Sequence, residues 1–309
     1  MKVLFQIIVL FSLISLFTNC EQLEAEESTI VTTSKKYEDL VALFKEWRSF
    51  EKPPLRDGAP DYTAETFSKR WTTFKNLQAQ LQAIDISDWS TKQKVDWHIV
   101  WAEMNGYDFN HRILKPWERD PAFYKSLWTY QSDVPAHEGP THHGTTEIWT
   151  YSFPLTSSER NRLLDDLKVI TPLNEQAKIN LVGNAKELWI AGIRTIKTQS
   201  QDLAKILEQE GVKADEALVS TIQAAIRSTD EFAEWLEEQA ESKTGASGIG
   251  KENYTWYLQN VHLVPLTWED EVMILKRELA RAWSALKLEE HRNRNLPELP
   301  AADSPEAYN

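Results

Sequence analysis

A run of histidines with one glutamate is the strongest candidate for chemistry in this 309-residue sequence. It reads HEGPTHH over residues 137–143, and His and Glu are the residues that bind zinc and activate water in peptidases. A helical zinc peptidase needs its two histidines four residues apart on one face. Here the spacing is longer, and Gly139-Pro140 interrupts any helix. The run therefore predicts a structural loop, in which His137, Glu138, His142 and His143 remain loop candidates for a metal.

A glycine-rich stretch from Gly245 to Lys251 has the glycine and lysine spacing of a phosphate-binding loop. Residue 252 is Glu, however, where the magnesium-binding Ser or Thr of such a loop belongs, and the stretch follows a long predicted helix rather than a strand. It therefore predicts a flexible hinge between helices, where glycine permits positive φ. No cofactor-binding residue is predicted in this chain.

Two acidic residues, Asp96 and Glu103, share one face of a predicted helix and could present paired carboxylates to a cleft or a metal. Pairing of Asp96 with Lys92 is the interpretation we favour, because acids on helices are usually solvated or paired. The serines show no Gly-x-Ser-x-Gly elbow, and Cys20 is the only cysteine. The sequence therefore predicts no catalytic residue.

Tryptophan is abundant, with 13 residues. Those on helical stripes are expected to pack between helices; they are Trp71, Trp97, Trp101, Trp235, Trp268 and Trp283. The better candidates for a surface that grips a ligand are Trp128, Trp149 and Trp256.

The amino terminus has the layout of a secretory signal peptide over residues 1–19, with one Lys and then an apolar run. Cys20 follows at the position of a bacterial lipoprotein cleavage site and is the predicted lipidation site, with plain secretion and an uncleaved anchor as alternatives. Residues 20–34 form a predicted acidic tether. The formal net charge of −13 argues against nucleic acid and against anionic lipid as partners. Contact with a membrane is therefore expected only through the anchor, in the cell envelope.

Apolar residues recur at helical spacing along most of the chain, which predicts an all-α array of long amphipathic helices. The clearest stripes run over residues 67–84, 218–236 and 268–286. Capping boxes predict helix starts at Ser90, Thr156 and Thr267, and Gly211 predicts a helix stop. The segment Val95 to Phe109 is apolar nearly all round, as is typical of a central helix buried on several sides.

The pattern becomes irregular over residues 116–154, where Pro, Gly and aromatic residues predominate and Trp149, Tyr151 and Phe153 alternate like a short extended piece. A soft division near residue 150 gives a helical subdomain over 35–150 and a long-helix subdomain over 151–295. A Pro-rich tail follows over 296–309. Its last six residues, Ser304 to Asn309, look like the opening of a helix, which we interpret as a chain cut short.

Three stretches carry a resemblance to a known family: residues 94–121, 248–258 and 288–298. Together they resemble the amino-terminal half of the domain of unknown function 885 family, whose members are large, mostly helical, often exported bacterial proteins that look like zinc metallopeptidases. In that family the metal motif His-Glu-x-x-Pro-Gly-His lies in the carboxyl-terminal half. The resemblance implies zinc and a peptide substrate for full-length relatives only, and leaves the activity of this chain open.

The resemblance implies that this chain is a non-catalytic amino-terminal half, inactive alone, whose partner is the missing carboxyl-terminal half. One wall of a cleft would carry Trp149, Tyr254, Trp256 and Tyr257. An acidic helical half that normally packs against a second half should also expose an apolar face when alone. The alternative is a complete, non-enzymatic helical lipoprotein that binds a peptide or a protein partner.

Overall fold

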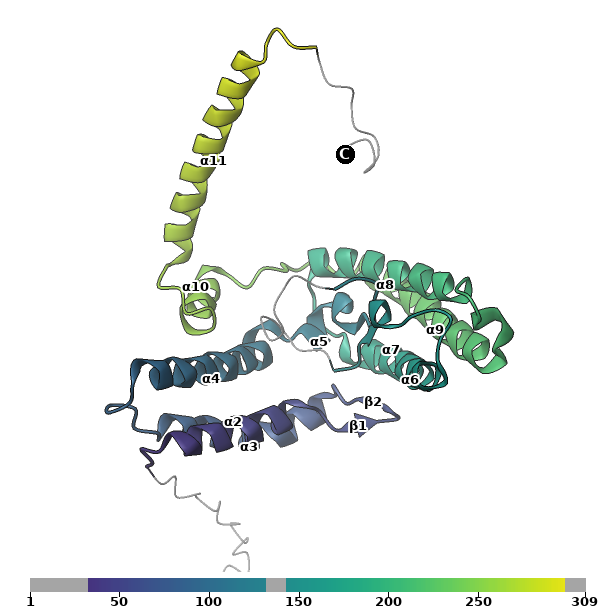
Figure 1. Cartoon of the computed structure of the whole chain (residues 1–309), viewed down its shortest axis with the longest axis horizontal. Coiled ribbons are helices and arrows are strands. Elements are labelled where there is room, and N and C mark those ends of the chain that lie inside the picture. Colours follow the sequence, from purple (N-terminus) through teal and green to yellow (C-terminus); the bar gives the residue numbers. More distant parts are fainter. Residues whose placement is uncertain (1–32, 132–142, 298–309) are drawn as a thin grey trace, which may run out of the picture.

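The computed structural model describes residues 33–131 and 143–297. Predictions that concern the signal peptide, Cys20, His137, Glu138, His142 and Ser304 to Asn309 lie outside the described residues. The all-α prediction is confirmed (Figure 1). The α-helices are α2 (Tyr37–Glu51), α3 (Ala64–Gln82), α4 (Thr91–Phe109), α5 (Pro116–Arg119), α6 (Ser157–Lys168), α7 (Ile170–Asn180), α8 (Lys186–Leu207), α9 (Glu216–Ala240), α10 (Lys251–Asn260) and α11 (Trp268–Arg292).

Strands in the described part of the chain are short. β1 (Leu55–Arg56) pairs antiparallel with β2 (Ala59–Pro60), and β3 (Leu127–Trp128) pairs parallel with β4 (Thr146–Glu147). They connect helices rather than form a sheet layer.

One layer of the molecule is formed by α2, α3 and α4 (Figure 1). The stripe predicted over residues 67–84 lies on α3 up to the helix end at Gln82, and its Phe74, Leu77 and Leu81 are buried against Trp47 of α2 and Met104 of α4. Ser90 caps α4 in the predicted capping box, which satisfies backbone N–H groups at the helix start. Apolar spacing and local capping thus agree in this layer.

A second group of helices, α6 to α9, packs around the stripe of α9. That stripe is buried as predicted, including Leu218, Ile222 and Phe232. Thr156 forms the predicted capping box of α6, and Gly211 adopts φ +82 after α8 ends. A backbone in this left-handed region favours glycine, which explains the helix stop.

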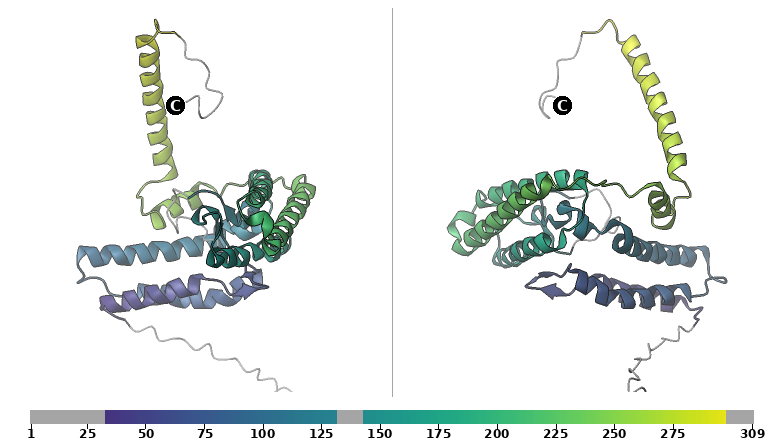
Figure 2. Two further views of the ribbon diagram at one scale, coloured as in Figure 1. Left: turned by 45° about the vertical axis from the view of Figure 1, so that its right-hand side comes forward. Right: turned by 180° about the vertical axis from the view of Figure 1, so that it is seen from behind.

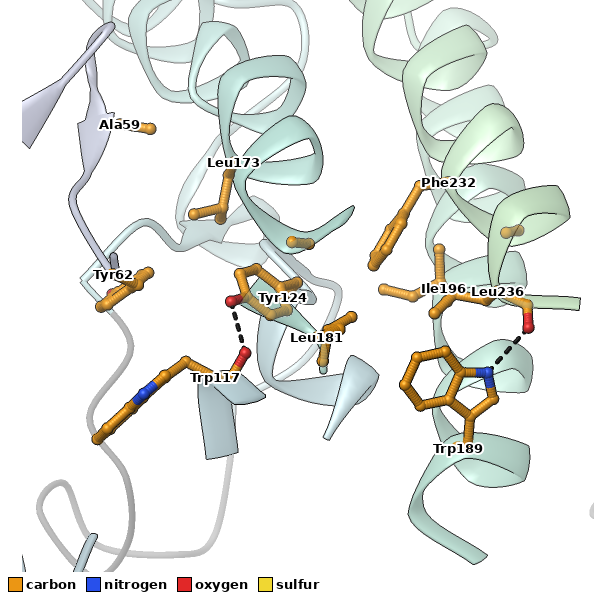
Figure 3. Close-up of a cluster of buried hydrophobic side chains, with 12 residues drawn as sticks. Ala59, Tyr62, Trp117, Tyr124, Leu173, Leu181, Trp189, Ile196, Phe232 and Leu236 are labelled. Carbon is orange, nitrogen blue, oxygen red and sulfur yellow. Dashed lines mark hydrogen bonds between the residues drawn. The ribbon is translucent and has the colours of Figure 1, made fainter. Parts of the chain in front are cut away.

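A central cluster of buried side chains joins the two groups, as Figure 3 shows. It brings Tyr62 and Trp117 together with Phe232 and Trp189 from the later helices. The Tyr124 hydroxyl donates to the carbonyl of Trp117 at 2.8 Å, and Trp189 Nε1 donates to the carbonyl of Leu236 at 2.8 Å. The cluster contains residues from both sides of position 150. The division into two subdomains near that position stays a prediction.

The structure differs from the prediction at α4 and at residues 148–150. The amino-terminal half of α4 is not buried on all sides, because Val95 is 52% exposed and Ile99 is also exposed; only its carboxyl-terminal half enters the core. Residues Ile148–Thr150 form a 3-10 helix, η3, rather than part of an extended piece. The Thr150 hydroxyl donates to the carbonyl of Glu147 at 2.7 Å, and this hydrogen bond stabilises η3.

The helix α11 stands away from the rest of the molecule in each view (Figure 2). Thr267 forms its predicted capping box, and the predicted apolar stripe is present, yet α11 buries no residue. Trp283, expected to pack between helices, is 59% exposed. None of the helices among the described residues is long and apolar enough to span a membrane.

Candidate functional site

The candidate site is a cavity of about 60 Å³ between the ends of α2 and α4, the start of α3, and α10. Its aromatic lining residues are Tyr62, Phe67, Tyr107, Trp117, Phe123 and Tyr257. Glu51, Arg70, Glu103, Asn110, His111 and His143 contribute polar groups. A few convergent polar groups within apolar walls are typical of ligand sites.

A π-helical turn, η1 (Asn110–Leu114), continues α4 into the site. It ends at Lys115, which has φ +43 and donates its backbone N–H to the carbonyl of Asn110 at 2.7 Å. Pro116 follows at the first position of α5 and disfavours an α-helical Lys115. The π turn therefore replaces a regular helix end, and such turns occur frequently at functional sites.

His111 lies among aromatic rings at this turn. Its ring centroid is 3.9 Å from that of Tyr107, 4.7 Å from Trp117 and 4.8 Å from Phe67. Burial lowers the pKa of His111 to about 4, because the charged imidazolium would lose its hydration. The ring is consequently neutral near pH 7.

The charged side chains of the site are arranged around Arg48. Its guanidinium contacts Glu51 at 2.7 Å and Glu103 at 3.0 Å, and Trp47 Nε1 also donates to Glu103 at 3.3 Å. Arg70, which also lines the cavity, donates to the carbonyl of Lys52 at 3.1 Å, and burial lowers the pKa of Arg70. The two carboxylates are thus held in place at the cavity wall.

Two tyrosine hydroxyls at the cavity stay protonated near neutral pH. Burial raises the pKa of Tyr107 to about 12 and also raises the pKa of Tyr62. The Tyr62 hydroxyl accepts a hydrogen bond of 2.7 Å from the backbone N–H of His143. These groups can orient a ligand as neutral hydrogen-bonding partners.

The predicted site residues fall in several places. The backbone of His143 contacts the site, while among the described residues no group of three or more His, Cys, Asp or Glu is placed to hold a metal. Tyr257 lines the cavity. Trp256 instead stacks on Phe109 at 5.5 Å, and the Tyr254 hydroxyl donates to Glu271 of α11 at 2.5 Å.

Trp149 lies in η3 and is not among the lining residues of the cavity. The structure therefore brings one of the four predicted cleft residues, Tyr257, to the site, and places the other three elsewhere. Tyr254 and Trp256 still lie on the same helix, α10, as Tyr257.

The two carboxylates considered on α4 are both partnered. The partner of Asp96 in the structure is the Tyr37 hydroxyl, which donates to it at 2.7 Å, rather than the predicted Lys92. Glu103 pairs with Arg48 and lines the cavity. In the glycine-rich stretch, Gly250 has φ +83, as the hinge interpretation expects. The amide of Gly245 donates to Asn184 Oδ1 at 2.7 Å, so this amide is committed to a structural contact.

Sequence reasoning missed Asn110, His111 and Tyr62. A signal for the first two was present, because they stand between the end of an apolar helical pattern and Pro116, where a helix must change course. Tyr62 reaches the site through β2 and a long-range contact with Gln176, whose side chain accepts the Tyr62 backbone N–H at 3.1 Å. No local pattern predicts that contact.

Fold and cavity together define an all-α helical array with a cavity that aromatic and polar side chains line. No protein-family model matches the sequence, and no curated protein matches it. A solved structure from Shewanella oneidensis, described as "a putative lipoprotein of unknown function", is similar, with a TM-score of 0.53 and 17% sequence identity. The match covers 85% of this chain and 48% of the other, so this chain spans about half the length of that protein. At this identity the likeness shows the fold alone.

Proposed function

We propose that this chain is a non-catalytic helical scaffold of the cell envelope, which forms one half of a larger protein resembling the exported, zinc-metallopeptidase-like family named above. In this proposal the chain alone is inactive. It contributes the aromatic cavity and a docking surface, and a carboxyl-terminal half supplies the zinc-binding motif and the peptidase chemistry.

The exposed apolar face of α11 carries this proposal. We call it the α11 seam and define it by Val272, Leu275, Leu279, Ala282 and Leu286. These residues alternate in steps of three and four, which is the heptad spacing of a helix that packs against another helix. Leu279 is 68% exposed, and Leu275 and Leu286 are exposed as well. A continuous apolar seam marks an interaction surface.

The occupant that we propose for the α11 seam is a helical segment of the carboxyl-terminal half. The heptad spacing calls for a helix rather than a strand or a small molecule. The similar solved structure also contains about as much additional chain as the part that this protein matches. Both observations support a two-part architecture, in which α11 crosses from one half to the other.

Lipidation at Cys20 is the proposed route to the envelope. Cys20 follows the apolar leader at the position of a lipoprotein cleavage site. We expect the chain in the membrane fraction after expression in a bacterium, and a Cys20→Ser variant in the soluble periplasmic fraction. Equal fractionation of both variants would contradict lipid anchoring and favour plain secretion.

The decisive experiment combines residues 21–309 with a separately produced carboxyl-terminal half, identified by translating the DNA that follows codon 309. We expect no zinc-dependent peptidase activity from the chain alone, and a stable complex with the second half that a Leu279→Glu variant does not form. The proposal would be overturned if the chain alone hydrolysed peptides and if both a chelator and, separately, the His142→Ala substitution abolished that activity.

The second candidate is a complete helical lipoprotein that binds a peptide or a protein partner without catalysis. The formed aromatic cavity favours it, because this site needs no second half to exist. A monodisperse monomer with one sharp cooperative melt would favour this candidate. Aggregation that the second half relieves would favour the two-part architecture.

A further inference from the structure

The face of α4 that points away from α2 and α3 is apolar. Val95, Ile99 and Gly106 are spaced four and seven residues apart and therefore share one side of the helix. Met104, which packs against α2 and α3, lies on the opposite side. In all three views of Figure 1 and Figure 2, α10 and α11 lie on the side of α4 that is opposite to α2 and α3.

In the described structure, α10 covers the carboxyl-terminal part of this face and leaves the rest exposed. Val261, which follows α10 directly, lies over Gly106, where an added Cβ would be 3.4 Å from Val261 Cγ1. Two turns before Gly106, about 10 Å along the helix, Ile99 is 48% exposed, and Val95 one turn further away is 52% exposed. We call Val95 and Ile99 the α4 patch.

The α4 patch and the α11 seam have α10 as their common neighbour. The backbone N–H of Trp268, at the start of α11, donates to Thr255 Oγ1 of α10 at 3.1 Å. The Tyr254 hydroxyl of α10 donates to Glu271 at 2.5 Å, and the seam begins at the next residue, Val272. Helix α10 has 10 residues and is therefore about 15 Å long. A partner of domain size on the first turns of the seam thus reaches the α4 patch as well.

The contacts that join α11 to α10 are too weak to fix the direction of α11. Helix α11 buries no residue, and its ion pair between Glu269 and Lys251, at 3.5 Å, joins two exposed side chains. Exposed ion pairs of this kind contribute about 0–1 kcal/mol to stability. An occupant that packs on both α4 and α11 would supply the contacts that hold the two helices at a fixed angle.

We propose that the α4 patch and the α11 seam are two parts of one docking surface, and that the carboxyl-terminal half of the larger protein covers both. The inference rests on the proposed function, which names that half as the occupant of the seam. The similar solved structure contains about as much further chain as the part that this protein matches, which is enough for a domain rather than one helix. Docking of that domain buries Val95 and Ile99 and holds α11 in place.

The test titrates the carboxyl-terminal half into residues 21–309 and compares the dissociation constants of Val95→Glu and Ile99→Glu with that of the unaltered chain. The matched control is Val41→Glu, because Val41 is an exposed valine of α2, on the far side of α4 from α10 and α11. Each patch variant should weaken the complex at least about tenfold, since the new carboxylate loses its hydration in the interface. Val41→Glu should bind like the unaltered chain, and all three variants should keep its melting temperature, because the substituted positions are exposed.

Two results of this titration would overturn the inference. One is binding by both patch variants that equals binding by the unaltered chain. The other is a loss of binding in Val41→Glu as large as that in the patch variants, which would assign the effect to the added charge rather than to the patch.

The same experiment separates the failure of this inference from the failure of the proposed function. If the unaltered chain forms no complex, both fail. If Leu279→Glu abolishes the complex while Val95→Glu and Ile99→Glu leave it intact, the seam is the interface and only docking on the α4 patch is refuted. If the chain alone is a dimer that the patch variants convert to a monomer, a second copy covers the patch and the inference is overturned.

Hydrogen exchange of the unaltered chain tests the patch without a substitution. Complex formation should slow the exchange of backbone amides over residues 92–102 of α4 and leave residues 38–45 of α2 unchanged, because only the first segment lies under the partner. A complex that slows exchange in α11 but not over residues 92–102 would contradict docking on α4.

Discussion

Two helices of equal length, α9 and α11, have different fates in this fold. Each has 25 residues and an apolar stripe at helical spacing. In α9 the stripe is buried against α6, α7 and α8, whereas α11 buries no residue. The comparison shows that apolar periodicity predicts a helix and its apolar face. It does not predict which part of the protein covers that face.

The largest expected loss of stability comes from shortening a buried side chain in the α9 stripe. Phe232 is fully buried in the central cluster, so Phe232→Ala should lower the free energy of unfolding by about 3–5 kcal/mol through lost burial and a residual cavity. Leu279→Ala on α11 should change it by less than about 0.5 kcal/mol. Urea unfolding measures both, and a loss at Leu279 as large as that at Phe232 would mean that the seam is covered within this chain.

The next largest effect is expected from His111, because its burial makes the free energy of unfolding depend on pH. The pKa of His111 is about 4 in the folded protein and near 6.5 in the unfolded chain. Between these pH values the unfolded state therefore binds a proton at His111 that the folded state does not bind. The stability is fully present above about pH 6.5 and decreases as the pH falls towards 4, by up to about 3 kcal/mol. Urea unfolding near pH 7 and pH 4 should show a larger loss for the unaltered protein than for His111→Phe. Equal losses would contradict a buried neutral imidazole.

A smaller difference in stability is expected between removing the cap of α9 and removing the cap of α11. Asp215 caps α9 by accepting the backbone N–H groups of Ala217 and Leu218, each at 3.1 Å, and it also pairs with Arg160. Asp215→Ala should therefore lower the free energy of unfolding by about 1 kcal/mol. Thr267→Ala removes the cap of α11 and should leave global unfolding unchanged. It should instead speed hydrogen exchange in the first turn of α11.

The contribution of Asp215 also has a defined pH window. The Arg160 guanidinium, with the backbone amides of the α9 start, lowers the pKa of Asp215 to about 2. The stabilisation is therefore present above the ordinary carboxyl pKa of about 4 and is lost as the pH falls towards 2. The difference in melting temperature between the unaltered protein and Asp215→Ala should shrink over that range. A constant difference would show that the charge plays no part.

The smallest effect on stability, but the most visible in solution, is expected for a charge within the α11 seam. Leu279→Glu should change the free energy of unfolding by less than about 0.5 kcal/mol, since the side chain is exposed. It should nevertheless reduce self-association in light scattering and binding of an apolar dye, because it interrupts the seam. Arg277→Gln, at an exposed position of the same helix outside the seam, lowers the net charge by the same one unit and is the matched charge control. Equal effects of the two changes would contradict a role for the seam.

Much of the fold follows from local physical chemistry. Capping boxes at Ser90, Thr156 and Thr267 and the stripe of α9 predict helix starts and buried faces correctly, because both depend on residues within a few positions of each other. The exposure of Val95 and the projection of α11 could not be predicted in this way. Each depends on which helices lie alongside, and that information is distributed over the whole chain.

The cavity was less predictable than the fold. Tyr257 was expected at a cleft, and it lies at the cavity. Pro116 indicates that the helix must change course near Asn110 and His111, but no residue pattern distinguishes a π turn there from an ordinary helix end. Tyr62 lies between β2 and α3, some 50 residues earlier in the chain, and only tertiary packing brings it to the cavity that His111 also lines.

The position of α10 has a thermodynamic consequence. On one side Tyr257 forms part of the cavity wall, and on the other the Tyr254 hydroxyl reaches Glu271 of α11. The same short helix therefore contacts both the cavity and α11. If binding of a partner to α11 shifts α10 and so changes the affinity of the cavity for a ligand, then by linkage an occupied cavity changes the affinity of α11 for that partner by the same factor.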